Sequence, residues 1–187
     1  MNFYNQNVME NIKKEYMEIN NSPNSNIGVT VGLPNELNFF EWQVTMIGPK
    51  DSSYKGGIFI LSIKFPQDYP NHPPEVCFQT PIYHVNVNPK KSYNSTGEPL
   101  GHVCISTLNW WKPEYKMTEV LINIFGLFYM ANPDSPYGID RANEFRNNRP
   151  LYEEKIKYFT KKYAKPAYCS IKRIKQKYDD SWDFSYP

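Results

Sequence analysis

The sequence predicts an α+β domain with an N-terminal helix, four antiparallel strands, an irregular segment and C-terminal helices. Three observations carry this prediction. The chain opens on an apolar repeat of helical period, residues 26–78 hold alternating and β-branched segments, and residues 116–164 hold apolar stripes of helical period. A run of strands followed by a run of helices is typical of the α+β class.

Residues 4–20 form the first predicted helix. Val8, Ile12, Tyr16 and Ile19 recur at i, i+4, i+8 and i+11, with charged residues between them. The segment NNSPNSN follows, and its proline and its Asn/Ser cluster favour a turn. The helix is therefore expected to end there.

Four strands are predicted next. NIGVTVGL (26–33) is short and β-branched, LNFFEWQVTMIG (37–48) alternates apolar and polar residues, and IFILSIKF (58–65) is almost continuously apolar. The proline-rich passage PQDYPNHPPEVCF (66–78) leads into a short fourth strand, because proline cannot donate to an inner ladder.

The C-terminal part of the chain is predicted to be helical. KMTEVLINIFGLFYM (116–130) has the broad apolar stripe of a core helix, IDRANEFRNN (139–148) is a short helix, and RPLYEEKIKYFTKKYA (149–164) is amphipathic. Residues 79–115 show no regular period. They are expected to be irregular.

Composition excludes several classes of protein. The chain of 187 residues has 40% hydrophobic residues, enough for one packed domain, and a net charge of +2, which indicates no nucleic-acid partner. No apolar run reaches the ~18 residues that span a bilayer, and the N-terminus has no secretory signal. Three cysteines without a CxxC pair predict a reducing compartment, cytoplasmic or nuclear, and no disulfide framework.

Cys104 lies in the irregular segment, just before a tryptophan pair, and its residue type leaves several functions open. A thiol can carry an acyl group as a thioester, with asparagine amides as donors to the oxyanion, or it can be an inert, buried side chain. His84 and His102 are either ordinary loop residues or bases of a cysteine hydrolase. With Cys104 they would give only three metal ligands, so no metal is expected.

An ordered set of motifs narrows these alternatives. They are WQVTMIGP (42–49), YKGGIF (54–59), FPQDYPNHPP (65–74), IYHVN (82–86), HVCIS (102–106), WKP (111–113) and NPDSP (132–136). The set resembles the ubiquitin-conjugating enzymes over about residues 8–164. The resemblance implies their UBC-like fold, in which the four strands form a meander, and a catalytic domain over residues 1–164. Residues 165–187 lie beyond it and hold the basic stretch SIKRIKQKYDD, so they are expected to be a C-terminal basic extension.

The resemblance also implies roles at a catalytic site. Cys104 is the acceptor cysteine for activated ubiquitin, and Asn86 stabilises the oxyanion or orders the active-site loop. Ser135 stands where the family has an Asp or Ser that positions the incoming lysine, and as a poor base it is expected to position rather than deprotonate. His84 is expected to be structural.

Three further residues lie close to Ser135 in the sequence, and with it they form the predicted entrance for the lysine, here called the gate. Asn132 and Tyr137 lie on either side of Ser135, and Asp134 is the nearby carboxylate, which is as well explained as a turn residue.

Partner surfaces follow from the same resemblance. Lys13 and Lys14 match positions that meet the activating enzyme, although a solvated helix face explains them equally well. Pro70, Lys112 and Pro113 match ligase-contacting loops. The expected partners are ubiquitin or a ubiquitin-like modifier, the activating enzyme, a ligase and a substrate lysine. No cofactor is expected, since ATP is used by the activating enzyme, and neither nucleic acid nor membrane is an expected partner.

The chain departs from the family pattern at several places, and two of them adjoin Asn86. Val85 replaces a proline, and the interval from Asn86 to Cys104 is about ten residues longer, with the extra residues over 87–99. These departures keep open a non-catalytic variant that binds a partner. A carrier of another ubiquitin-like modifier also stays open, because no residue of the sequence decides between the modifiers.

Overall fold

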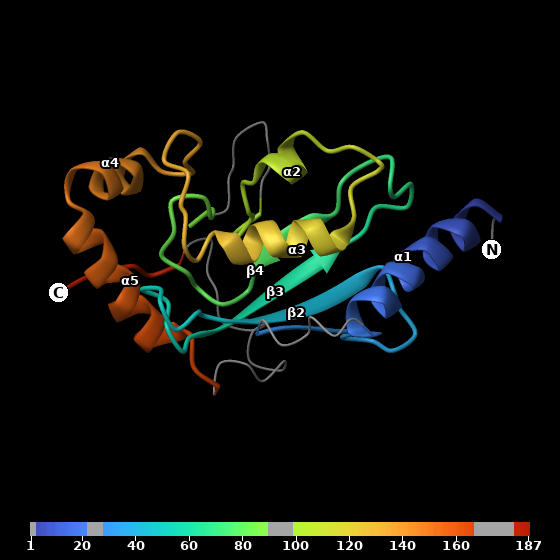
Figure 1. Cartoon of the computed structure of the whole chain (residues 1–187), viewed down its shortest axis with the longest axis horizontal. Helices are drawn as coiled ribbons and strands as arrows, with labels where there is room; N and C mark the ends of the chain where they lie inside the picture. The colour runs from blue at the N-terminus through green and yellow to red at the C-terminus, as the bar shows by residue number, and fades with distance from the viewer. Residues whose placement is uncertain (1–2, 22–27, 90–98, 167–181) are drawn as a thin grey trace.

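The computed structural model describes residues 3–21, 28–89, 99–166 and 182–187. The elements are α1 (Phe3–Asn21), β1 (Val29–Gly32), β2 (Glu41–Ile47), β3 (Ile58–Lys64), β4 (Glu75–Phe78), α2 (Ser106–Asn109), α3 (Met117–Gly126), α4 (Ile139–Asn147) and α5 (Arg149–Tyr163) (Figure 1). The predicted α+β architecture is confirmed. Residues 90–98 of the longer interval over 87–99, and most of the predicted extension, residues 167–181, lie outside the described ranges.

The sheet is an antiparallel meander in the order β1-β2-β3-β4. Its longest pairing joins β2 to β3 from Glu41 opposite Lys64 to Ile47 opposite Ile58. The alternation in β2 determines which face is buried: Trp42, Val44 and Met46 have no exposed surface.

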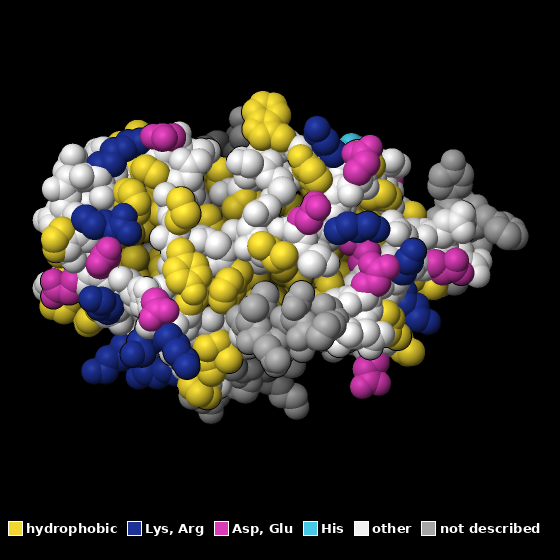
Figure 2. Space-filling view, viewed as in Figure 1, with side chains coloured by type: hydrophobic (Ala, Val, Ile, Leu, Met, Phe, Trp, Pro, Cys, Tyr) yellow, Lys and Arg dark blue, Asp and Glu magenta, His cyan; other side chains and the backbone are white. Residues whose placement is uncertain are grey.

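Helix α3 lies over one face of the sheet, α1 lies beside the β1 end, and α4 and α5 lie at the opposite end (Figure 1). The apolar stripe of α3 and the inner face of the sheet belong to one core cluster, which includes Met117, Val120, Ile124, Phe59 and Leu61. The outer surface mixes both signs of charge, and basic side chains gather near α5 (Figure 2). In the described ranges no helix is long and apolar enough to cross a membrane.

Two differences from the predicted elements have a physical cause. Helix α3 ends at Gly126 rather than at residue 130, because the backbone tightens: Leu127 N–H donates to the carbonyl of Ile124 at 3.1 Å. Phe128 is still buried in the core from this turn, so the apolar pattern continues beyond the helix. Helix α2 was not predicted, since four residues are too few to show a period.

The last six residues, 182–187, pack against the domain. Trp182 is buried, and its N–H donates to the carbonyl of Pro89 at 3.1 Å. The guanidinium of Arg141 lies between the rings of Tyr83 and Phe184, at 4.4 and 4.5 Å from their centroids. Pro89 precedes residues 90–98 directly, so the end of the chain contacts the base of the segment that leads to Cys104.

Candidate active site

Cys104 lies just before α2, on the rim of a cavity of about 480 Å³. The cavity is lined by residues 104–107, 109 and 110, by Asn123 and Leu127, and by Asn132, Asp134 and Ser135. Its side chain is partly exposed. Two polar groups approach the sulfur: Asn109 Nδ2 donates to Sγ at 3.2 Å, and Ser135 Oγ lies 3.4 Å from Sγ. The thiol is thus open to solvent and framed by a side-chain amide and a hydroxyl.

Isolated bridges fix the backbone around Cys104. The N–H of Cys104 donates to the carbonyl of Asn86 at 2.9 Å, and Val103 pairs with Val87. A second bridge joins His102 to Cys77, the edge of the sheet. Single bridges leave no periodic signal in a sequence, which explains why residues 79–115 look irregular and yet hold the cysteine in a defined place.

Asn86 ties this backbone to the loop that carries Ser135. Its side chain is 1% exposed, and Nδ2 donates to the carbonyls of Asn132 at 2.8 Å and Ser135 at 2.9 Å. Oδ1 accepts the N–H of Asn132 at 2.8 Å. Both amide hydrogens are therefore engaged by the loop.

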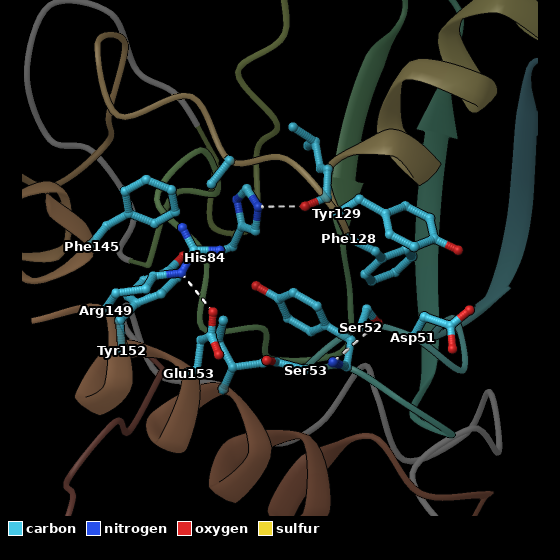
Figure 3. A pocket seen from close by; sticks show the side chains of 14 residues that line it. Asp51, Ser52, Ser53, His84, Phe128, Tyr129, Phe145, Arg149, Tyr152 and Glu153 are labelled. Atoms are coloured by element: carbon cyan, nitrogen blue, oxygen red, sulfur yellow. Dashed lines mark hydrogen bonds and ion pairs between the residues drawn. The ribbon is translucent and has the colours of Figure 1, made fainter.

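His84 is buried and neutral. Its Nδ1 accepts the N–H of Asn86 at 2.9 Å, which leaves the proton on Nε2 to be donated to the carbonyl of Leu127 at 3.1 Å (Figure 3). Burial lowers the pKa of this histidine to about 4. The ring lies against a cavity of about 180 Å³, where Arg149 and Glu153 of α5 form an ion pair at 2.7 Å (Figure 3).

Neither candidate base is hydrogen-bonded to the thiol. Both ring nitrogens of His84 are engaged elsewhere, and Nδ1 of His102 contacts the hydroxyl of Tyr137. Within the described ranges, the side chains that contact Sγ are those of Asn109 and Ser135. The same ranges contain no group of three His, Cys, Asp or Glu side chains that would hold a metal ion.

The remaining gate residues surround Ser135. Asn132 Oδ1 accepts the N–H of Asp134 at 3.0 Å, and the carboxylate of Asp134 pairs with Arg146 of α4 at 2.6 Å. The N–H of Tyr137 donates to the carbonyl of Val85 at 2.9 Å. Asn132, Asp134 and Ser135 therefore line the cysteine cavity, whereas Tyr137 is not among its lining residues and contacts Val85 and His102.

Val85 makes a contact that a proline cannot. Its N–H donates to the hydroxyl of Tyr152 in α5 at 3.2 Å, and its side chain is fully buried. A proline at this position has no N–H but fixes φ. With Val85 in place of the proline, the loop loses a fixed φ and gains a hydrogen bond to α5.

The residues predicted to meet partners lie away from the cysteine. On α1, Lys14 pairs with Glu18 at 3.9 Å, and Lys13 lies 5.7 Å from the ring centre of Phe39. Both lysines are exposed on the helix surface.

The two predicted ligase loops are joined by a hydrogen bond. Trp111 Nε1 donates to the carbonyl of Pro70 at 2.7 Å, which places Pro70 beside Lys112 and Pro113, both exposed. Trp110 lies next to them with 78% of its surface exposed. An exposed tryptophan on a surface is an interaction signal. The sequence analysis noted the tryptophan pair but gave Trp110 no role.

This arrangement supplies a reachable thiol, an amide, a hydroxyl and a carboxylate around one cavity, which suits acyl transfer through sulfur. A family model described as ubiquitin-conjugating enzyme matches residues 11–160. The chain belongs to the ubiquitin-conjugating enzyme family, a family of transferases, and the resemblance seen in its motifs is confirmed. Among its relatives, ubiquitin-conjugating enzyme E2 15 of Schizosaccharomyces pombe is 34% identical over 160 residues, 78% of this chain and 89% of that protein.

Asn109 and Trp110 are the residues near the site that the sequence analysis missed. Their signal was present in one respect: both follow Cys104 within six positions in a segment too short to be judged by periodicity. Their side-chain directions depend on the single turn of α2, whose last bonds run from Asn109 N–H to Ile105 and from Trp110 N–H to Ser106.

Proposed function

We propose that this chain accepts activated ubiquitin from an activating enzyme as a thioester on Cys104 and transfers it, with a ligase, to a substrate lysine. In the first step the thiolate attacks the activating enzyme's ubiquitin thioester. In the second step the lysine amine attacks the new thioester, and Cys104 leaves as a thiolate. No histidine base is needed, because the acyl group arrives activated.

The observation that carries the proposal is the contrast between two cysteines. Cys104 has its sulfur on the rim of a cavity of about 480 Å³. Cys77 is buried in β4, and burial raises the pKa of its thiol to about 12. A protein C-terminus and a lysine can both reach the first sulfur, whereas the second is an inert thiol of the core.

The contacts of the gate support separate roles for its residues. The loop-ordering role of Asn86 is supported by its three hydrogen bonds to residues 132 and 135. Ser135, held by its carbonyl, presents a hydroxyl beside the sulfur, where it can orient an amine. Asp134 already pairs with Arg146, so it acts through charge near the entrance rather than as a free base.

The partner surfaces follow the exposed residues. The activating enzyme would meet Lys13 and Lys14 on α1. A ligase would meet the surface made by Pro70, Lys112 and Pro113, with Trp110 as its apolar anchor.

A charging assay tests the proposal. The protein is mixed with ubiquitin-activating enzyme, ATP and ubiquitin, and the products are separated on a non-reducing gel. We expect a band that is shifted by one ubiquitin and removed by thiol reductant. The band is expected to be absent in Cys104→Ala and present in Cys77→Ala and Cys169→Ala.

Other outcomes discriminate the alternatives. A band that forms with another ubiquitin-like modifier and its own activating enzyme, but not with ubiquitin, would assign the chain to that modifier. No band with any modifier would contradict a carrier and leave a binding protein. Labelling by an electrophilic ubiquitin probe, together with turnover of a ubiquitin ester without activating enzyme, would indicate a hydrolase.

A further inference from the structure

Asn109 is the polar side chain nearest the sulfur, at 3.2 Å from Nδ2 to Sγ. It is the last residue of α2 and is exposed. In the described part of the chain, the second Nδ2 hydrogen and the Oδ1 atom of Asn109 have no protein partner. The backbone of Asn109 is thus held in α2, and its side-chain amide has a hydrogen that is free to be donated.

Asn86, the other amide of the site, lacks that capacity. Its two Nδ2 hydrogens are donated to the carbonyls of Asn132 and Ser135, and its Oδ1 accepts an N–H. To donate to a reacting group, it would have to release a carbonyl of the loop that places Ser135. An amide that is 1% exposed and satisfied on every atom serves the loop.

The position of Asn109 suits the group that develops charge. In a thioester the carbonyl carbon is bonded directly to Sγ, so the oxyanion that forms on it lies two bonds from the sulfur. A donor that touches the sulfur needs only a side-chain rotation to reach that oxygen at the 2.7–3.1 Å range of an oxyanion contact. The geometry points to Asn109 as a catalytic residue that donates Nδ2–H to the oxyanion during lysine transfer; this inference rests on the proposed thioester.

The step balances as follows. The neutral lysine amine attacks the thioester carbon, a C–N bond forms, and the C=O π electrons move onto oxygen, where Asn109 donates. The amine proton passes to water. The oxygen electrons then restore C=O, the C–S bond breaks, and the sulfur leaves as a thiolate, to which the same amide donates. Ser135, whose Oγ lies 3.4 Å from Sγ, remains available to the amine.

The test measures discharge in a single turnover. Wild-type protein and variants are charged, the activating enzyme is quenched, and free lysine is added over a range of concentrations. We expect Asn109→Ala to lower the saturating rate constant about 100-fold, the lower end for loss of one oxyanion donor. The lysine concentration at half the maximal rate is expected to stay unchanged, because the amide does not bind the amine.

Three further variants separate donation from structure. Asn109→Asp keeps the shape but has no N–H, and we expect it to be at least as slow as Asn109→Ala. Asn109→Gln restores an amide on an exposed rim, and we expect it to recover the rate to within about 10-fold of wild type. Asn20→Ala, an exposed asparagine of α1 that lies outside the cysteine cavity and donates to the carbonyl of Tyr16 at 3.0 Å, should discharge at the wild-type rate.

Each result has a distinct meaning. A wild-type rate in charged Asn109→Ala would overturn the role of Asn109 and leave the carrier function intact. So would an equal loss in Asn109→Gln and Asn109→Ala, or a loss that comes with a lower free energy of unfolding. If ubiquitin does not charge the wild-type protein, the same series is run with the modifier that does. A protein that no modifier charges would overturn both proposals.

Discussion

Asn86 and Asn132 are joined in both directions: the Nδ2 of Asn86 donates to the carbonyl of Asn132, and its Oδ1 accepts the N–H of the same residue, each at 2.8 Å. This reciprocal pair connects residues 46 positions apart and holds Asn132, which lines the cysteine cavity. Asn86→Ala removes both bonds and the one to Ser135. We expect the free energy of unfolding to fall by about 2 kcal/mol, from loop groups left unpaired.

Urea unfolding and single-turnover discharge, measured on the same preparations, check this prediction. Asn86→Ala should lose both stability and rate, whereas Asn109→Ala should lose rate alone. Asn20→Ala is a suitable control, because its amide makes one exposed bond within α1, to Tyr16 at 3.0 Å. Unchanged stability in Asn86→Ala would contradict the loop-ordering role.

Because His84 is buried, we expect the free energy of unfolding to fall in mild acid. Burial lowers its folded pKa to about 4, below the unfolded value of about 6.5, so the unfolded state binds the proton first as pH falls. Its contribution is complete above pH 6.5 and is lost progressively down to about pH 4. Between pH 7 and pH 5 we expect the free energy of unfolding to fall by about 2 kcal/mol from this group.

Urea titrations at pH 7, 6 and 5 measure the slope of the free energy of unfolding against pH. His84→Gln removes the titrating group and should flatten it, although stability at pH 7 is expected to be lower. His72→Gln is the control: this exposed histidine pairs with Asp68, and its loss should leave the His84 slope in place. Equal slopes in wild type and His84→Gln would show that other groups cause the acid sensitivity.

Glu15 is a buried carboxylate that connects three parts of the chain. It accepts the hydroxyl of Tyr69 at 2.7 Å and the N–H of Met117, the first residue of α3, at 2.8 Å. Negative charge there also suits the helix N-terminus. We expect Glu15→Ala to lower the free energy of unfolding by about 3 kcal/mol, since it leaves two buried donors unpaired.

Thermal or urea unfolding of two companion variants locates the cause. Glu15→Gln keeps an acceptor for Met117 and should lose only about 1 kcal/mol. Glu18→Ala removes the exposed partner of Lys14 and should change stability by less than about 0.5 kcal/mol. Similar losses in all three variants would indicate a general effect of charge on α1.

Phe184 attaches the end of the chain through the guanidinium of Arg141, which also donates to the carbonyl of His84 at 3.2 Å. Its ring packs edge-on against Phe159 at 4.9 Å between centroids. Phe184→Ala is expected to lower the unfolding free energy by about 2 kcal/mol, less than a fully buried phenylalanine because the ring is half-buried. Urea unfolding of Phe184→Ala beside Pro187→Ala, the exposed last residue, checks this; equal stability would contradict the attachment.

The apolar repeat predicted the helices and strands whose sequences have a regular repeat. The alternation around Trp42 placed β2, and the stripe from Met117 to Ile124 placed α3, because burial imposes the repeat on the sequence. Glu15 shows the limit: in the sequence it is one of the charged residues between the apolar positions of the first helix, and the fold buries it against Tyr69. That contact depends on residues 54 positions away, which no local pattern encodes.

The site was predicted from motifs rather than from period. Cys104, Asn86 and Ser135 were identified by their order along the chain. In the structure Cys104 and Ser135 line one cavity, and the buried Asn86 donates to the carbonyl of Ser135. Asn109 was not identified, since its direction depends on a single helical turn. The packing of residues 182–187 depends on Arg141 and Tyr83, two residues that looked like ordinary members of other elements.

The unequal burial of Cys77 and Cys104 gives the protein a selective chemical handle. At neutral pH a thiol with a pKa of about 12 is almost entirely protonated and is also shielded, so alkylating reagents are expected to pass over Cys77. In a chain with Cys169→Ser, a fluorophore, a spin label or a non-hydrolysable modifier mimic would then attach at Cys104 alone. The folded enzyme would need no change in its core to be labelled at one chosen atom.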